Sequence, residues 1–279
     1  MRIGIIGAGK VGASLGLYLS SSMATIVGVY DTNQEIANQV ATSLQTKHYD
    51  ELESLVSASD VLFMTVTDGA ISSVWEQIAT FNLAEKIICH CSGALSSEVF
   101  VGIEEKGACG YSVHPAMIVS NHEAVAALAK SAFTIEGTPR RLHEVKEIFT
   151  QMGNRVCEIA VSDKVRYHAA AVIISNFSVA LAKISIDMLA SCGFTEEEQK
   201  IFLPLMQTSV TDIAENGIIA ALAGPIERAD TGTIEKHLAE LVGDEKEIYR
   251  LLANQNLAIA RRKNPQRNYD DLAVVLSKK

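Results

Sequence analysis

The stretch RIGIIGAGKVG, residues 2–12, decides how the rest of the sequence is interpreted. Residues 2–6 are a short β-rich run that predicts a strand, and a glycine-rich turn follows at once. Apolar side chains then recur at helical intervals over residues 11–21, and residues 25–30 are a second β-rich run. A strand, a glycine turn, a helix and a second strand within about thirty residues are typical of a dinucleotide-binding βαβ unit.

The turn has the glycine spacing of the dinucleotide fingerprint. Its first glycine permits a tight turn, its second lets the backbone approach a pyrophosphate, and its third lets the helix pack closely on the strand. The first N–H groups of the helix would point at the phosphates. The predicted cofactor-binding residues are therefore Gly7, Ala8, Gly9, Lys10, Val11 and Gly12. A glycine turn without a nucleotide is the alternative interpretation, because such turns are common.

Asp31 ends the second predicted strand, nineteen residues after Gly12. A carboxylate at this place accepts hydrogen bonds from the adenosine ribose hydroxyls, and its charge repels a 2′-phosphate. Residues 32–34 contain no Arg or Lys that would bind that phosphate. NAD(H) is therefore the favoured cofactor, while NADP(H) is possible. The alternative is that Asp31 is simply a turn or helix-capping aspartate.

The order of the remaining segments predicts an α/β fold with two domains. Further strands are expected at residues 61–66, 86–89, 110–114, 132–135 and 155–159, with amphipathic helical stretches between most of them. This alternation predicts a mainly parallel sheet covered by helices. After about residue 161 the β-rich runs disappear, and long helices are expected at residues 163–191 and 196–215. We predict a Rossmann domain over residues 1–160 and an all-α domain over residues 161–279.

Composition excludes several classes of function. The formal net charge of −9 argues against a nucleic-acid-binding protein, because binding phosphates requires an excess of Lys and Arg. The five scattered cysteines do not form the pattern of a disulfide framework. Lys10 and the glycine spacing argue against a secretory signal at the N-terminus, and no later run of about 18 uninterrupted apolar residues predicts a membrane helix. We expect a cytoplasmic protein.

Polar residues follow the predicted strands at the edge of the sheet where ligands bind in such folds. Thr65 and Val66 are assigned to the cofactor site, at the end of one strand. Ser92 and Gly93 follow the next strand, and they would offer a hydroxyl and a close backbone approach to the substrate or the nicotinamide. His114 ends another strand and would donate a hydrogen bond or transfer a proton near neutral pH. For each residue the alternative is a loop position with no role in binding.

Two cysteines and two histidines near this edge do not predict a metal site. Cys89 and Cys91 lie two residues apart on a strand and share a face, whereas His90 between them points away. No CxxC pair is present to complete a tetrahedral site. We predict that the cysteines are small buried residues and that the protein binds no metal.

The predicted helix that begins near residue 163 carries a polar stripe. Lys164, His168 and Ser175 lie within about 40° of one another around its axis, and Asn176 lies at the margin of the stripe. The other faces are rich in Ala, Val and Ile and are expected to be buried. A buried lysine with a lowered pKa could donate a proton to a developing alkoxide. The alternative is an exposed Lys164 and a structural core histidine.

Several motifs resemble those of known oxidoreductases, namely Cys91-Ser92-Gly93, Tyr167-His168-Ala169-Ala170-Ala171, Ser175-Asn176 and Ala221-Leu222-Ala223-Gly224-Pro225-Ile226. They are similar to a bacterial Rossmann-like family whose C-terminal domain has no known function and whose members are described as NADP-linked oxidoreductases. The wider resemblance is to the superfamily of β-hydroxyacid dehydrogenases, 6-phosphogluconate dehydrogenase, ketopantoate reductase and pyrroline-5-carboxylate reductase. The helical domain in particular resembles the C-terminal domain of 6-phosphogluconate dehydrogenase.

The resemblance implies hydride transfer between NAD(P) and a small carbonyl, imine or hydroxy-acid substrate, and a homodimer formed through the helical domain. The resemblance matches Lys164 to the catalytic lysine. With the residue positions described above, we predict catalytic roles for Lys164, His168 and His114, and substrate binding by Ser92, Gly93 and Asn176. In β-hydroxyacid dehydrogenases an asparagine follows the catalytic lysine by four residues, whereas here that position is His168. This departure leaves open a second hypothesis, a non-catalytic NAD(P)-binding regulator or scaffold.

Overall fold

The computed structural model describes residues 1–22, 24–117 and 124–278. They form two compact units, Met1–Ser175 and Asn176–Lys279. The boundary lies further along the chain than the predicted residue 160. The first unit includes the helix α7 (Lys164–Ile174) because the first turn of this helix is hydrogen-bonded to the sheet of that unit.

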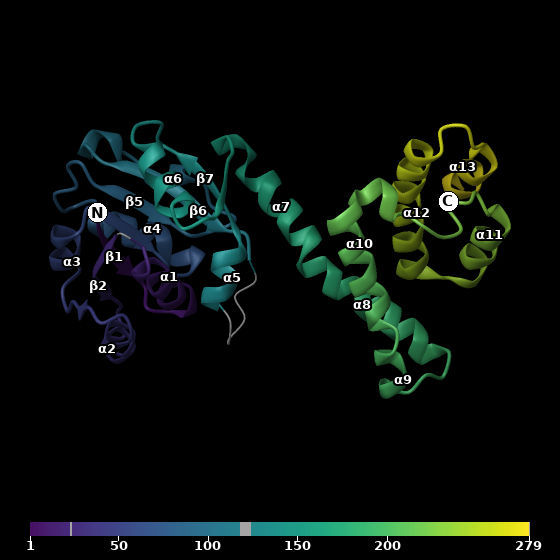
Figure 1. Ribbon diagram of the computed structural model, residues 1–279, viewed down its shortest axis with the longest axis horizontal. Coiled ribbons are helices and arrows are strands. Elements are labelled where there is room, and N and C mark those ends of the chain that lie inside the picture. The colour runs from purple at the N-terminus through teal and green to yellow at the C-terminus, as the bar shows by residue number, and fades with distance from the viewer. Residues whose placement is uncertain (23, 118–123, 279) are drawn as a thin grey trace. The chain divides into compact units, whose positions relative to one another are not determined.

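The first unit is built on one eight-stranded sheet with the order β3-β2-β1-β4-β5-β6-β7-β8 (Figure 1). Its strands are β1 (Arg2–Ile6), β2 (Thr25–Tyr30), β3 (Lys47–His48), β4 (Val61–Met64), β5 (Ile87–His90), β6 (Cys109–Pro115), β7 (Ala132–Gly137) and β8 (Arg155–Glu158). Every neighbouring pair is parallel except β6 and β7, which are antiparallel. The predicted mainly parallel sheet is confirmed. The two-residue strand β3 was not predicted because it is too short to show a period.

Helices cover both faces of this sheet. They are α1 (Lys10–Ser20), α2 (Gln34–Ser43), α3 (Leu52–Ala58), α4 (Asp68–Ile78), α5 (Ala124–Lys130) and α6 (Leu142–Thr150), with short 3₁₀ turns at Ser97–Val99, Glu104–Lys106 and Val161–Asp163. Buried residues of α1, α5 and α6 pack on one face around Phe63 and Phe133. Buried residues of α3 and α4 pack on the other face around Leu62 and Ile88. The burial of strand residues on both faces explains why β4 and β5 are continuously apolar or nearly so.

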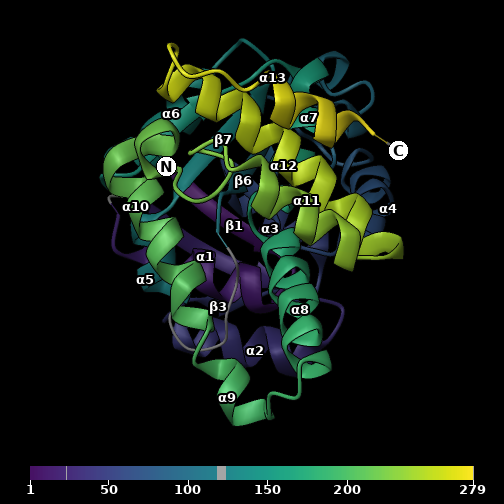
Figure 2. The same cartoon turned by 90° about the vertical axis from the view of Figure 1, so that its right-hand side faces the viewer.

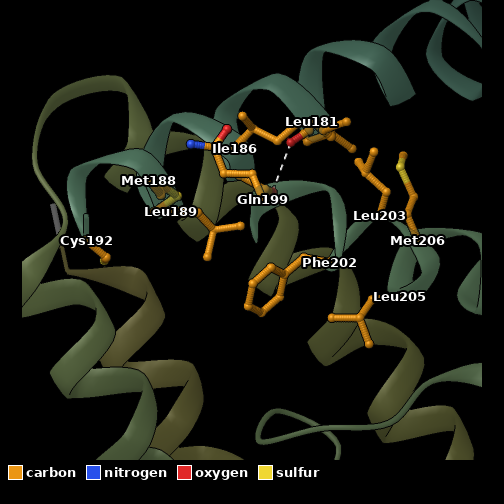
Figure 3. A pocket seen from close by; sticks show the side chains of 12 residues that line it. Leu181, Ile186, Met188, Leu189, Cys192, Gln199, Phe202, Leu203, Leu205 and Met206 are labelled. Carbon is orange, nitrogen blue, oxygen red and sulfur yellow. Dashed lines mark hydrogen bonds between the residues drawn. The ribbon is translucent and has the colours of Figure 1, made fainter. Parts of the chain in front are cut away.

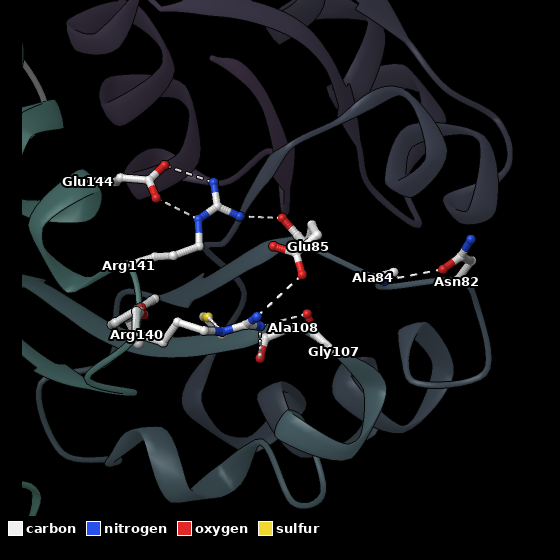
Figure 4. Close-up of polar contacts among 10 residues, drawn as sticks. Asn82, Ala84, Glu85, Gly107, Ala108, Arg140, Arg141 and Glu144 are labelled. Carbon is white, nitrogen blue, oxygen red and sulfur yellow. Dashed lines mark hydrogen bonds and ion pairs between the residues drawn. The ribbon is translucent and has the colours of Figure 1, made fainter.

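Two arginines after β7 join the loops that precede β5 and β6 (Figure 4). Arg140 donates to the carbonyl oxygen of Gly107 at 2.7 Å and pairs with Glu85. Arg141 pairs with Glu144 and donates to the carbonyl of Glu85. These contacts lie at the amino ends of β5 and β6, so they brace the edge of the sheet opposite to the one where ligands bind in this fold.

The described residues of the second unit, 176–278, form helices joined by loops and turns, with no strand among them. Its helices are α8 (Asn176–Ser191), α9 (Glu196–Lys200), α10 (Leu203–Ala221), α11 (Thr231–Glu240), α12 (Gly243–Lys263) and α13 (Asp270–Ser277). The helices α11, α12 and α13 lie together (Figure 2). Their buried residues form the core of this unit around Ile234 and Leu272. The helix predicted over residues 163–191 is interrupted at Ser175, whose φ of −105° and ψ of −72° depart from helical values. The helix predicted over residues 196–215 is likewise divided, into α9 and α10.

The expectation that the apolar faces of the helix at residues 164–174 are buried is wrong. Val165, Ile173 and Ile174 are 75%, 60% and 81% exposed, and Lys164 is the buried residue of α7. The helical stretch Val161–Ser191 is also long and apolar enough to span a membrane, with a mean hydropathy of 1.8 in its most apolar window. None of the residues in that window is buried in the described structure.

Candidate functional site

The glycine turn between β1 and α1 has the shape that a dinucleotide requires. Gly7 has a φ of +100°, which residues with a side chain rarely adopt. A Cβ atom added to Gly12 would collide with the carbonyl oxygen of Gly7 and with Thr65 Oγ1. Gly9 differs from both, because a Cβ atom added there would meet no protein atom within 4 Å. The turn and the helix packing therefore explain Gly7 and Gly12, whereas the open space at Gly9 is where a ligand would approach the backbone.

Thr65 and Val66 support this turn from the end of β4. The Thr65 hydroxyl donates to the carbonyl oxygens of Gly7, at 2.7 Å, and of Ile6, at 3.2 Å. A Cβ atom on Gly7 would come within 3.0 Å of Val66. Both residues lie against the predicted cofactor turn and hold it in place.

Asp31 joins the two loops at the carboxyl ends of β1 and β2. Its Oδ2 accepts a hydrogen bond from the Ala8 N–H at 2.7 Å, and its Oδ1 accepts one from the Asn33 N–H at 2.8 Å. Asn33 is itself the N-cap of α2. Asp31 therefore has the turn role considered in its alternative interpretation. Because a carboxylate has about four lone-pair sites, it can also accept hydrogen bonds from a ribose. The turn and Asp31 together fit a nicotinamide dinucleotide.

The first turn of α7 is hydrogen-bonded to β6 through two side-chain pairs. Lys164 Nζ donates to Ser112 Oγ at 2.6 Å, and Tyr167 Oη lies 2.8 Å from His114 Nδ1. Residues two apart on a strand share a face, and residues three apart on a helix are neighbours. This matching of spacings places Lys164 and Tyr167 above Ser112 and His114, at the carboxyl end of β6.

His168 completes the cluster on the far side of Gly93. The rings of His168 and His114 are 6.2 Å apart between centroids. A Cβ atom on Gly93 would lie 2.6 Å from His168 Cδ2 and 2.8 Å from His114 Nε2. The backbone of Gly93 therefore lies close to both imidazoles and leaves no room for a side chain.

His90 and Ser92 fix the loop that carries Gly93. His90 Nδ1 accepts a hydrogen bond from the Ser92 N–H at 3.2 Å, so Nε2 carries the ring proton that is donated to the Ser96 carbonyl, also at 3.2 Å. The Ser92 hydroxyl oxygen accepts hydrogen bonds from the N–H groups of Ala94 and Leu95. Ser92 therefore caps the loop with its side chain, and its carbonyl oxygen accepts a hydrogen bond from the Ser112 hydroxyl at 3.3 Å.

Burial and charge set the protonation states around this cluster. Burial, with the nearby positive charge of Lys164, lowers the pKa of His114 to about 4. Burial also lowers the pKa of His90 to about 4. Both imidazoles are therefore neutral at pH 7. Burial lowers the pKa of Lys164, and the nearby carboxylates of Glu136 and Asp68 oppose this effect.

The cysteines near this edge are thiols at neutral pH. Burial raises the pKa of Cys91 to about 12, and it raises the pKa of Cys89 well above its ordinary value. Among the residues that the structure describes, no group of three or more His, Cys, Asp or Glu side chains is arranged to hold a metal ion.

The structure brings five of the predicted site residues together, namely Lys164, His168, His114, Ser92 and Gly93. Ser175 donates its hydroxyl proton to the carbonyl of Ala171 in its own helix. Asn176 begins the second unit, so its predicted role in substrate binding stays a prediction.

Sequence reasoning did not assign Tyr167, Ser112 or Glu136 to the site. The spacing of Tyr167 from Lys164, three residues along a helix, could have indicated the first. The spacing of Ser112 from His114, two residues along a strand, could have indicated the second. The position of Glu136 depends on the antiparallel pairing of β7 with β6, which no local pattern shows.

Comparison with known families and structures agrees with this geometry. The Rossmann-like domain family matches residues 1–115, and the family described as a domain of unknown function, DUF2520, matches residues 131–256. The chain thus combines a Rossmann-like domain with a DUF2520 domain, which confirms the resemblance stated from the motifs. Comparison with curated proteins finds no match.

Three solved structures illustrate the similarity. A Thermotoga maritima protein is 26% identical, with a TM-score of 0.77 over 94% of this chain and 99% of its own. A Bacteroides fragilis protein described provisionally as an NADP oxidoreductase is 22% identical, with a TM-score of 0.69 over 92% and 98%. The 1-pyrroline-5-carboxylate reductase of Streptococcus pyogenes is 13% identical, with a TM-score of 0.62 over 92% and 98%. The last two likenesses show a shared fold.

Proposed function

We propose that this protein is an NAD(P)-dependent oxidoreductase that transfers hydride to or from a small carbonyl, imine or hydroxy-acid substrate. One observation carries the proposal. A dinucleotide turn and a cluster of Lys164, His114, Tyr167 and His168 lie at the carboxyl edge of the same sheet. That edge is where open α/β sheets bind cofactor and substrate.

The cofactor would lie on the β1–α1 turn. Its pyrophosphate would approach Gly9 and the first N–H groups of α1, and its adenosine ribose would lie at Asp31. The acidic group at this place favours NAD(H) over NADP(H). When bound, the nicotinamide supplies the hydride donor or acceptor.

The cluster at the end of β6 would handle the proton that accompanies the hydride. His168 is partly exposed beside Gly93, so it can contact a substrate directly. Lys164 is 1% exposed and is bonded to Ser112, so we assign it the supply of positive charge that stabilises a developing alkoxide. His114 is neutral and bonded to Tyr167, and this pair would donate a hydrogen bond to the substrate oxygen. The Ser92–Gly93 backbone would orient the substrate.

Titration with NADH and NADPH, followed by turnover with a panel of small keto acids, hydroxy acids and imines, tests this function. We expect tighter binding of NADH and cofactor oxidation with at least one substrate. Asp31→Ala should weaken NADH binding more than NADPH binding, because only NADH has the free 2′-hydroxyl on its adenosine ribose that Asp31 would bind. If Asp31→Ala weakens the binding of NADH and NADPH equally, Asp31 makes only its turn contacts and does not bind the ribose. Tight cofactor binding with no turnover across the panel would favour the regulator hypothesis, and no binding of either cofactor would contradict both.

We further propose that the protein is a homodimer that forms through its helical unit. α8 and α10 have no buried residue among those described. Together with α9 they line an apolar cavity of about 610 Å³ (Figure 3). Leu205, on its wall, is 66% exposed. Apolar surface of this extent is typical of an interface between subunits.

Light scattering should therefore give twice the chain mass of 30.1 kDa. Leu205→Glu should produce monomers, because it places a charge in the interface. Val101→Glu, at a residue of the first unit that is 77% exposed, should leave the dimer intact. A monomeric wild type would contradict the dimer. Recovery of the protein only in membrane fractions would contradict the expected cytoplasmic location and assign residues 161–191 to a bilayer.

A further inference from the structure

The buried carboxylate of Glu136 is hydrogen-bonded to the loop that carries Gly93. Glu136 on β7 pairs directly with Ser112 on β6, so the two side chains share one face of the sheet. Glu136 is 1% exposed and Ser112 is completely buried. Lys164, also 1% exposed, is hydrogen-bonded to that same Ser112. A buried acid is therefore paired across the two strands with the serine that binds a buried lysine.

Glu136 holds the far end of the loop through both of its carboxylate oxygens. Oε1 accepts a hydrogen bond from the Ser97 N–H at 2.9 Å, and Oε2 accepts one from the Ser97 hydroxyl at 2.6 Å. On the other side of Gly93, His90 accepts a hydrogen bond from the Ser92 N–H and donates one to the Ser96 carbonyl. The loop that carries Gly93 is thus held on both sides of Gly93 by hydrogen bonds of buried side chains.

The charge of Glu136 also matters to Lys164. The ionisable and aromatic groups around the Lys164 ammonium are Glu136, Cys91, Asp68, His90, His114 and the Tyr167 ring. Cys91 is a neutral thiol and both histidines are neutral at pH 7. Asp68 is exposed, so water screens its charge. Glu136 is therefore the buried negative charge that offsets the cost of burying the Lys164 ammonium.

We propose that Glu136 is a positioning residue of the active site, which keeps Lys164 charged and holds the Gly93 loop against His114 and His168. The consequence for turnover rests on the proposed oxidoreductase function. The consequence for Lys164 does not, because it concerns the chain alone.

NMR titration of the lysine ε-CH₂ groups, in protein labelled with ¹³C-lysine, tests the charge effect directly. Lys164→Met identifies the Lys164 signal. Glu136→Gln retains an oxygen that can accept from Ser97 but removes the charge, so the Lys164 titration should move to lower pH. Glu98→Gln is the matched control, since Glu98 is an exposed residue of the same loop region, and it should leave that titration unchanged. Ser97→Ala removes one loop contact and keeps the charge, so it should also leave the midpoint unchanged.

Two further measurements keep the proposal testable if Glu136→Gln does not fold. Glu136→Asp should restore a Lys164 titration close to that of the wild type. Glu136→Ser also removes the charge, so it should move the Lys164 titration to lower pH as Glu136→Gln does. A Lys164 midpoint that stays at its wild-type value when the charge at position 136 is removed would overturn the proposal. If the midpoints move as expected but no substrate is turned over, the role of Glu136 stands and the oxidoreductase function fails.

Where a substrate is found, Glu136→Gln should lower kcat about tenfold with little change in KM for the cofactor. It should also shift the alkaline limb of the pH profile in the same direction as the Lys164 titration. A loss of kcat with an unshifted profile would reduce Glu136 to a structural contact and would contradict its proposed action through Lys164.

Discussion

His168→Asn should lower turnover by about 10²–10⁴-fold while the affinity for the reduced cofactor stays unchanged. His168 is the partly exposed imidazole of the cluster, next to Gly93 and 6.2 Å from His114 between ring centroids. Asparagine keeps a similar size and polarity but cannot transfer a proton near neutral pH. Steady-state kinetics with the substrate found in the panel, together with a cofactor titration, measure the two effects separately.

His143→Asn is the control for this experiment, because His143 is an exposed histidine of α6 in the same unit. It should leave both turnover and cofactor binding as in the wild type. Lys164→Met distinguishes the two proton donors considered from the sequence. If Lys164→Met abolishes turnover while His168→Asn retains it, the donor is Lys164, and the assignment to His168 is wrong.

Gly9→Ala should reduce the affinity for both NADH and NADPH about a hundredfold without destabilising the protein. The added methyl group would meet no protein atom within 4 Å, so the fold should accept it. It would, however, occupy the space through which the pyrophosphate approaches the backbone. Fluorescence titration measures the affinity, and thermal unfolding without cofactor checks the stability.

Gly69→Ala provides a matched control at the start of α4. A methyl group there also meets no protein atom within 4 Å, and the residue lies outside the dinucleotide turn. Cofactor binding should be unaffected. Full affinity in Gly9→Ala would show that no dinucleotide lies along this turn, and it would contradict the proposed cofactor site.

Most of the first unit could be predicted because its signals are local. The strands β1 and β2 begin and end at the predicted residues. The glycine spacing predicted a turn whose Gly7 has the expected positive φ. Such patterns depend on side-chain period and backbone conformation within a few residues. The break at Ser175 was missed because the apolar period continues across it.

The candidate site could be predicted only in part. Lys164, His168 and His114 were selected as polar residues at a strand end or on an apolar helix, and the structure places them together. Glu136 was not selected, because polar residues alternate with apolar ones along many strands and the sequence does not show that this one is buried. The burial assumed for the apolar faces of α7 was also wrong. Periodicity shows which faces are apolar but not what covers them.

The sequence by itself determined the dinucleotide turn, the change from alternating strands to helices, and the polar residues available for chemistry. These follow from local sterics and from periodicity along the chain. Only the tertiary structure decided that β7 runs antiparallel to β6, so that Glu136 lies opposite Ser112, and that α7 places Lys164 and Tyr167 over β6. Contacts between residues this far apart in the sequence depend on how the sheet is ordered and how the helix docks, and these are properties of the folded chain as a whole.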